Sequence, residues 1–227
     1  MCLILVGWRR HPQYPLVVAA NRDEFHGRPA AAAEFWSDQP SILAGRDLEA
    51  RGTWMGVSRS GRFAAVTNYR GALEPRAPES RGALVARFLA NGEPPARYIA
   101  ALAERARAYS GFNLLVADDA ELWWISNRDG APRRLENGVY GLGNALLDSP
   151  DVAQAKARFQ EAIEFPAVDS LFAVLARSTI VNPQYGTRCA TILLKRNDGR
   201  IRYAERTFSR DGAEQDTLQF EFTASTP

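Results

Sequence analysis

Short apolar runs separated by turn residues recur along the chain and indicate a protein rich in β-strands. The first run covers residues 2–6 and the second covers residues 16–20. Both are apolar at consecutive positions, which is typical of strands buried on two faces. Glycine and proline between the two runs predict a hairpin that brings the N-terminus near the end of the second strand. Further strands are predicted over residues 52–58, 62–68, 112–117, 121–126, near 139, and over 188–196, 200–209 and 217–223.

Helical patterns interrupt the strands twice. Helices are predicted over residues 80–92 and 95–109, then after Ser149-Pro150 and near residues 170–177. Because almost all strand connections are tight hairpins, the sheets should be mainly antiparallel. The order of elements therefore predicts an α+β fold in which two helical layers cover two stacked antiparallel sheets. Nothing resembles a linker, so one domain over residues 1–227 is expected.

Two segments are expected to be irregular. The polar residues 21–24 directly follow five apolar residues, a pattern that predicts the end of the second strand and the start of a loop. Residues 26–45 contain glycine and proline without clear alternation and are also predicted to form a loop.

Composition and charge narrow the functional classes. The chain is 46% apolar and 24% charged, as expected of a globular protein with a core. Its formal charge is +2 and its arginines are spread along the sequence, which does not favour nucleic-acid binding. No apolar run approaches the roughly 20 residues of a membrane span, and the N-terminal run is too short for a signal peptide. We therefore expect a soluble cytoplasmic protein without a membrane span.

The two cysteines, Cys2 and Cys189, do not indicate a disulfide framework. Removal of Met1 would give Cys2 both a thiol and an α-amine, whose pKa of ~8 suits a base near neutral pH. A nucleophile activated by its own α-amine is a known catalytic arrangement. The alternative is that Cys2 is a small hydrophobic residue at the start of a strand. Cys189 is predicted to be a buried strand thiol.

Polar residues at strand ends are the remaining candidates. In Asn21-Arg22-Asp23-Glu24, a guanidinium would favour a nearby thiolate and a carboxylate would orient an α-ammonium. The alternative is a solvated strand end with a local ion pair. Asn68 and Asn144 also follow apolar strands, and their amides suit either an oxyanion or a turn. His11 and His26 are too few and badly spaced for zinc, so no metal or cofactor is predicted.

Several motifs in fixed order resemble the NRDE family, also called the transport and Golgi organisation 2 family. The resemblance runs from residue 2 to about residue 194. The motifs are Cys2, Asn21-Arg22-Asp23-Glu24, Gly52-Thr53-Trp54-Met55-Gly56-Val57, Thr67-Asn68-Tyr69-Arg70, Gly111-Phe112-Asn113-Leu114 and Tyr185-Gly186-Thr187-Arg188.

That family is similar to the N-terminal-nucleophile (Ntn) hydrolases, near the choloylglycine hydrolases and penicillin V acylases. The resemblance implies a four-layer αββα sandwich and attack on a non-peptide amide bond. It implies that Cys2 is nucleophile and base, that Arg22 faces the thiol and that Asp23 contacts the α-amine. The acylases tend to carry an acid at the third position after the arginine, where this chain has Phe25, so Asp23 or Glu24 would take its place.

The resemblance also implies Asn68 and Asn144 as oxyanion donors, and we expect Asn21, Glu24, Arg70 and Arg188 to contact the substrate. Two functional hypotheses remain. The first is an amidohydrolase acting on a small acyl conjugate. The second is a binding or chaperone protein for haem, a lipid or an acyl metabolite on the same fold. Neither requires a nucleic-acid partner, and the sequence predicts no oligomeric state.

Overall fold

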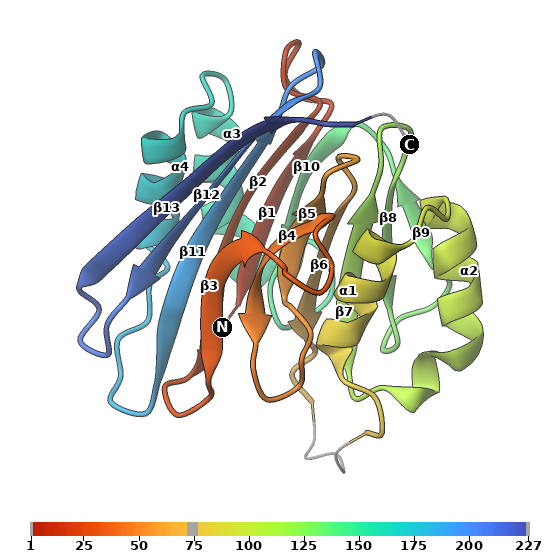
Figure 1. Ribbon diagram of the computed structural model, residues 1–227, viewed down its shortest axis with the longest axis horizontal. Coiled ribbons are helices and arrows are strands. Elements are labelled where there is room, and N and C mark those ends of the chain that lie inside the picture. The colour runs from red at the N-terminus through yellow and green to blue at the C-terminus, as the bar shows by residue number, and fades with distance from the viewer. Residues whose placement is uncertain (1, 72–76, 226–227) are drawn as a thin grey trace. The chain divides into compact units, whose positions relative to one another are not determined.

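The structure is a computed structural model that describes residues 2–71 and 77–225 (Figure 1). The chain divides into two compact units. Within the described residues, unit 1 comprises residues 2–28, 137–143 and 147–224, and unit 2 comprises residues 29–71, 77–136, 144–146 and 225. Each unit contains one sheet and its own helices, and the two are described separately.

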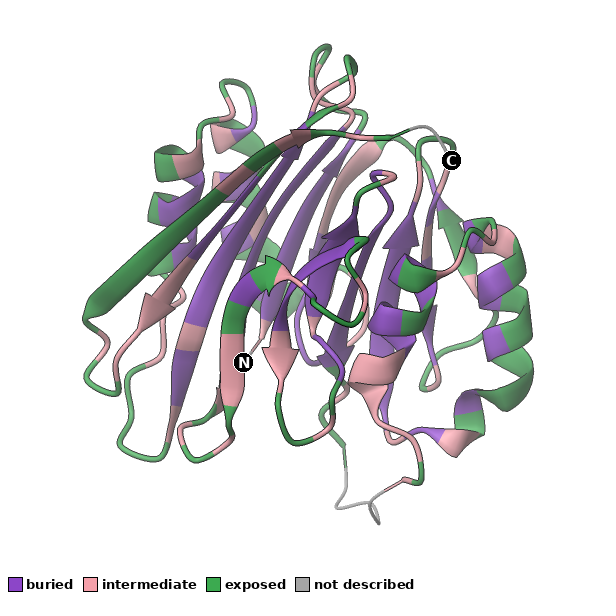
Figure 2. Ribbon diagram, viewed as in Figure 1, coloured by how far each residue is buried: buried purple, intermediate pink, exposed green. Residues whose placement is uncertain are grey.

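Unit 1 is built on a six-stranded antiparallel sheet with the strand order β10-β1-β2-β11-β12-β13. Figure 2 shows that the central strands are buried along most of their length, whereas the edge strand β13 is largely exposed. The strands are β1 (Leu3–Trp8), β2 (Leu16–Phe25), β10 (Gly138–Leu142), β11 (Tyr185–Lys195), β12 (Arg200–Phe208) and β13 (Glu214–Thr223).

Two helices pack on one face of this sheet, α3 (Ala153–Ala162) and α4 (Val168–Ala176), with a short 3-10 helix η2 (Pro150–Val152) before them. Alternate residues of β2, such as Val17 and Ala19, share one apolar cluster with Phe159 of α3 and Leu171 of α4. Alternation places these side chains on a single face, so burial beneath the helices fixes which face of β2 each residue occupies.

Unit 2 is built on a seven-stranded antiparallel sheet in which the strands follow chain order. Its helices contribute Phe88, Leu89 and Ile99 to an apolar cluster that also contains strand residues such as Ile42. The elements are β3 (Ala30–Phe35), β4 (Ile42–Asp47), β5 (Met55–Ser58), β6 (Phe63–Asn68), α1 (Arg81–Ala90), α2 (Pro95–Arg105), the 3-10 helix η1 (Ala106–Ala108), β7 (Phe112–Ala117), β8 (Leu122–Ser126) and β9 (Arg133–Leu135).

The α+β class with two antiparallel sheets is confirmed, and most predicted strands and all four predicted helices are present. The prediction that the second strand ends before Asn21 is wrong. β2 continues to Phe25, because β11 pairs with it as far as Tyr185. The predicted loop over residues 26–45 instead contains β3 and β4, and β9 was not predicted. The single domain over residues 1–227 stays a prediction.

None of the helices in the described ranges combines the length and the apolar character needed to cross a membrane.

One close backbone approach explains a glycine of the Gly52–Val57 motif. A Cβ on Gly52 would lie 2.5 Å from the carbonyl carbon of Gly82 and 2.7 Å from its oxygen. Gly82 belongs to the first turn of α1, and the Thr53 N–H donates to its carbonyl at 3.3 Å. The segment before β5 therefore touches the backbone of the helix directly, which only glycine permits.

Replacing Gly52 with alanine should destabilise unit 2, because the new methyl group can be accommodated only by moving backbone. We expect Gly52→Ala to lower the free energy of unfolding by ~3 kcal/mol, as measured by urea denaturation. Gly130→Ala is the matched control, because a Cβ at Gly130 meets nothing within 4 Å. Equal stability of the two variants would contradict the packing argument.

Candidate active site

The start of β1 lies beside the last third of β2. These strands pair antiparallel with Leu3 opposite Asn21, so Cys2 is level with Arg22 when the register is continued by one residue. The Cys2 side chain is half-buried, and its Sγ donates to the backbone carbonyl of Asp23 at 3.4 Å. Strand pairing thus brings the N-terminal segment to the polar residues of β2.

β11 supports Asp23 from the other side of β2. Thr187 is opposite Asp23 in the register, and its Oγ1 donates to Asp23 Oδ1 at 2.6 Å. The same hydroxyl oxygen accepts the Ile180 N–H at 2.9 Å. Asp23 is only 4% exposed, so its carboxylate is held in place by a hydroxyl that is itself fixed by backbone.

Glu24 has a different environment. Its Oε2 lies 3.9 Å from Arg22 Nη2 and 3.9 Å from Arg28 Nε, and its Oε1 accepts the Phe25 N–H at 2.9 Å. Glu24 therefore pairs with two arginines. Asp23 is more buried, and its own backbone carbonyl accepts the hydrogen bond from the thiol. Which acid contacts an α-amine of Cys2 stays a prediction.

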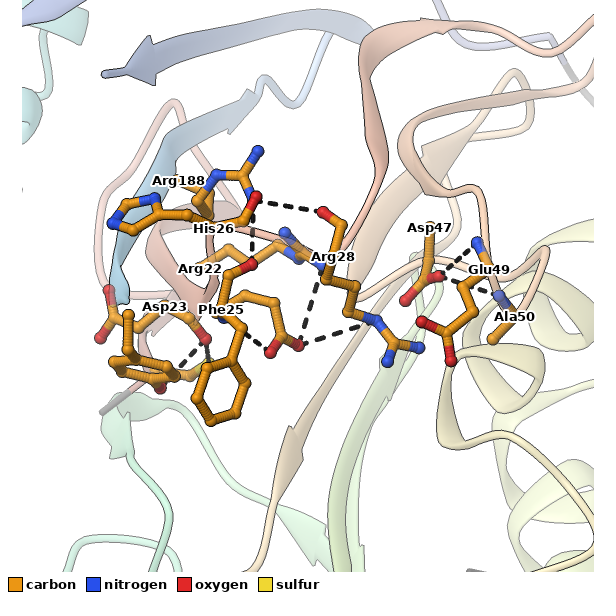
Figure 3. Close-up of polar contacts among 12 residues, drawn as sticks. Arg22, Asp23, Phe25, His26, Arg28, Asp47, Glu49, Ala50 and Arg188 are labelled. Atoms are coloured by element: carbon orange, nitrogen blue, oxygen red, sulfur yellow. Dashed lines mark hydrogen bonds and ion pairs between the residues drawn. The ribbon is translucent and has the colours of Figure 1, made fainter. Parts of the chain in front are cut away.

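Arg188 fastens the chain that follows β2. Its Nη1 donates to the carbonyls of Phe25, His26 and Arg28 at 3.1, 3.3 and 3.2 Å (Figure 3). Burial lowers the pKa of Arg188, and the positive charge of Arg22 acts in the same direction. Arg188 therefore stabilises the backbone at the end of β2 and just after it. Its predicted contact with the substrate stays a prediction.

The electrostatics of Cys2 are dominated by burial. Desolvation, followed by the negative charge of Asp23, raises the pKa of the Cys2 thiol to about 11. Arg22 opposes this shift, in the direction expected from the sequence, but its effect is smaller than that of burial. Near neutral pH the thiol is therefore protonated. Burial also raises the pKa of Cys189 well above its ordinary value.

Of the remaining predicted site residues, Asn21 belongs to unit 1, where its Nδ2 donates to the Leu175 carbonyl at 3.1 Å. Asn68, Arg70 and Asn144 belong to unit 2. Asn144 Nδ2 donates to the Asn68 carbonyl at 2.7 Å, and the Arg70 N–H donates to the Asn144 carbonyl at 2.6 Å. An amide nitrogen carries two N–H groups, so this contact uses one of them. Asn113 Nδ2 donates to Thr67 Oγ1 at 3.2 Å and to the Ala145 carbonyl at 2.9 Å, which ties the segment after Asn144 to β6 and β7. The convergence of Asn68 and Asn144 on Cys2 stays a prediction.

Sequence reasoning assigned no role to two residues of β11 that contact Asp23. Thr187 binds its carboxylate, and Tyr185 Oη donates to its backbone carbonyl at 3.1 Å. Both belong to the Tyr185–Arg188 motif, which was the available signal, but the pairing that joins them to β2 spans more than 160 residues. Among residues 2–71 and 77–225, no group of three or more His, Cys, Asp and Glu side chains is placed to hold a metal ion.

The fold is that of the Ntn hydrolases. Conjugated bile acid hydrolase from Clostridium perfringens, solved as a variant, superposes with a TM-score of 0.57 at 9% identity, covering 100% of this chain and 98% of that one. The Caenorhabditis elegans N-acylethanolamine-hydrolyzing acid amidase ortholog gives a TM-score of 0.51 at 13% identity, covering 85% and 92% of the two chains.

The chain belongs to the transport and Golgi organisation 2 family, whose model matches residues 1–184. It is 32% identical over 275 residues to the transport and Golgi organization protein 2 homolog of Bos taurus, covering 98% of this chain and 99% of that protein. The Homo sapiens homolog is 32% identical over 276 residues, with the same coverage. The Drosophila melanogaster protein is 30% identical over 185 residues, covering 72% of this chain and 65% of that protein.

Removing the Thr187 hydroxyl should destabilise the end of β2. Thr187→Val keeps the shape but takes a donor from the Asp23 carboxylate and an acceptor from the Ile180 N–H. We expect a loss of about 1–3 kcal/mol in the free energy of unfolding, measured by urea denaturation. Thr187→Ser keeps the hydroxyl and should lose much less. A Val variant as stable as the wild type would contradict the role assigned to the hydroxyl.

The pKa of Cys2 predicts slow, strongly pH-dependent alkylation in the chain that retains Met1. Only the thiolate reacts, and a pKa of about 11 leaves about one thiol in ten thousand ionised at pH 7. The rate of Cys2 labelling by iodoacetamide should rise about tenfold per pH unit from pH 7 to 10. Cys189 should stay unlabelled while the protein is folded. A labelling rate that levels off below pH 9 would contradict the raised pKa.

Proposed function

We propose that the chain is an N-terminal-cysteine amidohydrolase that cleaves a non-peptide amide bond of a small acyl conjugate. The proposal rests on one observation: the Cys2 thiol lies at the end of β2 in contact with Asp23, level with a buried arginine. Thiol, guanidinium and carboxylate are the groups that an N-terminal cysteine nucleophile uses.

Removal of Met1 is the activating step in this proposal. While Met1 is attached, the nitrogen of Cys2 is an amide and cannot act as a base. After removal it is an α-amine with a pKa of ~8, which can accept the thiol proton near neutral pH. The new ammonium and Arg22 then both favour the thiolate, against the desolvation that raises its pKa.

The reaction would proceed through a thioester. The α-amine takes the proton from Sγ as Sγ attacks the amide carbonyl carbon, and N–H donors stabilise the oxyanion. The C–N bond then breaks, and the ammonium returns its proton to the departing amine. Water attacks the thioester, releases the carboxylic acid and restores the thiol. We propose Asn68 and Asn144 as the amide donors to the oxyanion, and Asp23 as the group that orients the α-amine.

The comparisons support this chemical class through the fold. The solved proteins with the same fold include a conjugated bile acid hydrolase and an N-acylethanolamine-hydrolyzing acid amidase, as their names state. The homologs in the family carry names that state no reaction, so the hydrolase proposal rests on the site of this chain together with its fold.

A binding protein for haem, a lipid or an acyl metabolite is the second candidate. The observation that favours it is the raised pKa of the Cys2 thiol, which keeps the sulfur neutral in the chain that retains Met1. A neutral, half-buried thiol does not disturb an apolar ligand. The two functions differ in whether the Cys2 sulfur and the α-amine are required.

The decisive experiment compares the Met1-free and Met1-retaining forms, separated and verified by intact mass. Only the Met1-free form should hydrolyse N-acyl-4-nitroanilides. Cys2→Ala should abolish turnover, and Cys2→Ser should leave a much weaker nucleophile. Thermal unfolding of each variant shows whether the fold is kept.

One result would contradict the proposed mechanism, and another would contradict the hydrolase itself. Equal turnover by both forms would show that the α-amine is not the base. Undiminished binding of acyl amides by a folded Cys2→Ala protein, with no hydrolysis by the Met1-free wild type, would establish the binding function.

A further inference from the structure

The Cys2 thiol and the Tyr185 hydroxyl donate hydrogen bonds to the same carbonyl oxygen, that of Asp23. Cys2 Sγ donates to the Asp23 carbonyl at 3.4 Å, and Tyr185 Oη donates to the same oxygen at 3.1 Å. Two donors within hydrogen-bond distance of one oxygen are near neighbours. The phenol of Tyr185 therefore lies beside the candidate nucleophile, although it comes from β11 at the other end of the sequence.

Tyr185 is half-buried and forms an aromatic pair with the exposed Phe25. It is opposite Phe25 in the register of β2 and β11, and the two rings meet edge to face with their centroids 5.3 Å apart. Phe25 is 59% exposed, which is unusual for a large apolar side chain at the end of a central strand. Tyr185 is thus near the thiol through its hydroxyl and contacts the exposed Phe25 through its ring.

The backbone beneath this pair is fixed by many hydrogen bonds. The Phe25 N–H donates to Glu24 Oε1 at 2.9 Å, and its carbonyl accepts Arg188 Nη1 at 3.1 Å and the Arg28 N–H at 3.0 Å. The next residue, His26, donates its N–H to the Gln184 carbonyl at 2.9 Å. Figure 3 shows Phe25 projecting from this bonded backbone. A preorganised surface binds without a further ordering cost.

The flanking charges are engaged with protein groups. Glu24 pairs with Arg22 and Arg28, and Arg188 Nη1 is bonded to three carbonyls. A ligand on the aromatic pair would therefore meet ring faces and edges in preference to an uncompensated charge, which suits an apolar, uncharged group.

We infer that Phe25 and Tyr185 form the acyl-binding surface of the site and select conjugates with an apolar acyl chain. The inference rests on the proposed function, because it assigns the carbonyl of that acyl group to Cys2 Sγ. The acyl chain would run from the carbonyl across the Tyr185 ring to Phe25. Phe25 and Tyr185 are then specificity residues, and an acetyl group would be too short to reach Phe25.

Two matched reagents test this surface without any need for hydrolysis. N-benzylmaleimide and N-methylmaleimide both alkylate thiols and differ in their apolar group. For the Met1-free chain, the ratio of the two second-order rates at Cys2, measured by peptide mass mapping, should exceed the ratio for glutathione about tenfold. Phe25→Ala should reduce that ratio to the glutathione value. Tyr185→Phe, which keeps the ring, should preserve it, and Tyr185→Ala should not.

Phe165→Ala is the matched control, because Phe165 is 85% exposed and lies between α3 and α4. It should leave the ratio unchanged. An unchanged ratio in Phe25→Ala would overturn the inference, as would a wild-type ratio equal to that of glutathione.

Hydrolysis of acyl anilides is measured in a separate experiment. A Phe25-dependent ratio with no hydrolysis would refute the hydrolase but keep the apolar surface. Hydrolysis that is equally fast for acetyl and hexanoyl anilides in wild type and Phe25→Ala would keep the hydrolase and refute the surface.

Discussion

The backbone hydrogen bonds that hold β2 between β1 and β11 set the position of the candidate site in unit 1. With Leu3 opposite Asn21 and Thr187 opposite Asp23, the thiol and the supporting hydroxyl reach the same residue of β2 from two directions. A slip of one residue would reverse the faces of Arg22 and Asp23. The slip is opposed further along the strand, where alternate apolar residues of β2 are buried with α3 and α4. The geometry at the thiol therefore depends on ordinary core packing at a distance.

The sequence predicted what local pattern determines and missed what distant pairing determines. Hairpins and helices are determined by residues close together in the sequence, and most of those predictions are confirmed. The polar run after Ala20 reads locally as a strand end, yet the backbone stays extended because β11 supplies hydrogen-bond partners for it. The same reason explains the candidate site. Cys2, Arg22 and Asp23 were chosen for their chemistry, whereas Thr187 and Tyr185 became visible only when the register placed them on Asp23. Apart from the motif to which both belong, nothing in the local sequence shows that these two strand residues contact Asp23.

Burial also reverses a simple charge argument. A guanidinium next to a thiol favours the thiolate, and Arg22 does act in that direction on Cys2. The thiol pKa nevertheless rises, because removing an anion from water costs more than a neighbouring cation returns, and the Asp23 carboxylate adds repulsion. Removal of Met1 would leave the number of charges unchanged and would move the α-ammonium onto Cys2 itself. The Asp23 carboxylate, whose charge already acts on the thiol, is held in place by the Thr187 hydroxyl.

Each residue of the Tyr185–Arg188 motif has a separate contact that supports the end of β2. Tyr185 donates to the Asp23 carbonyl, and Thr187 donates to the Asp23 carboxylate. Arg188 donates to the carbonyls of Phe25, His26 and Arg28. Gly186 allows the close approach these contacts require, since a Cβ there would lie 2.8 Å from a carbonyl oxygen of the preceding loop. Four consecutive residues of β11 therefore fix the backbone, the carboxylate and the aromatic surface of one strand end. The Asp23 carbonyl also accepts the hydrogen bond from the thiol. A change in this part of β11 would therefore affect both the Asp23 carboxylate and the aromatic pair of Phe25 and Tyr185.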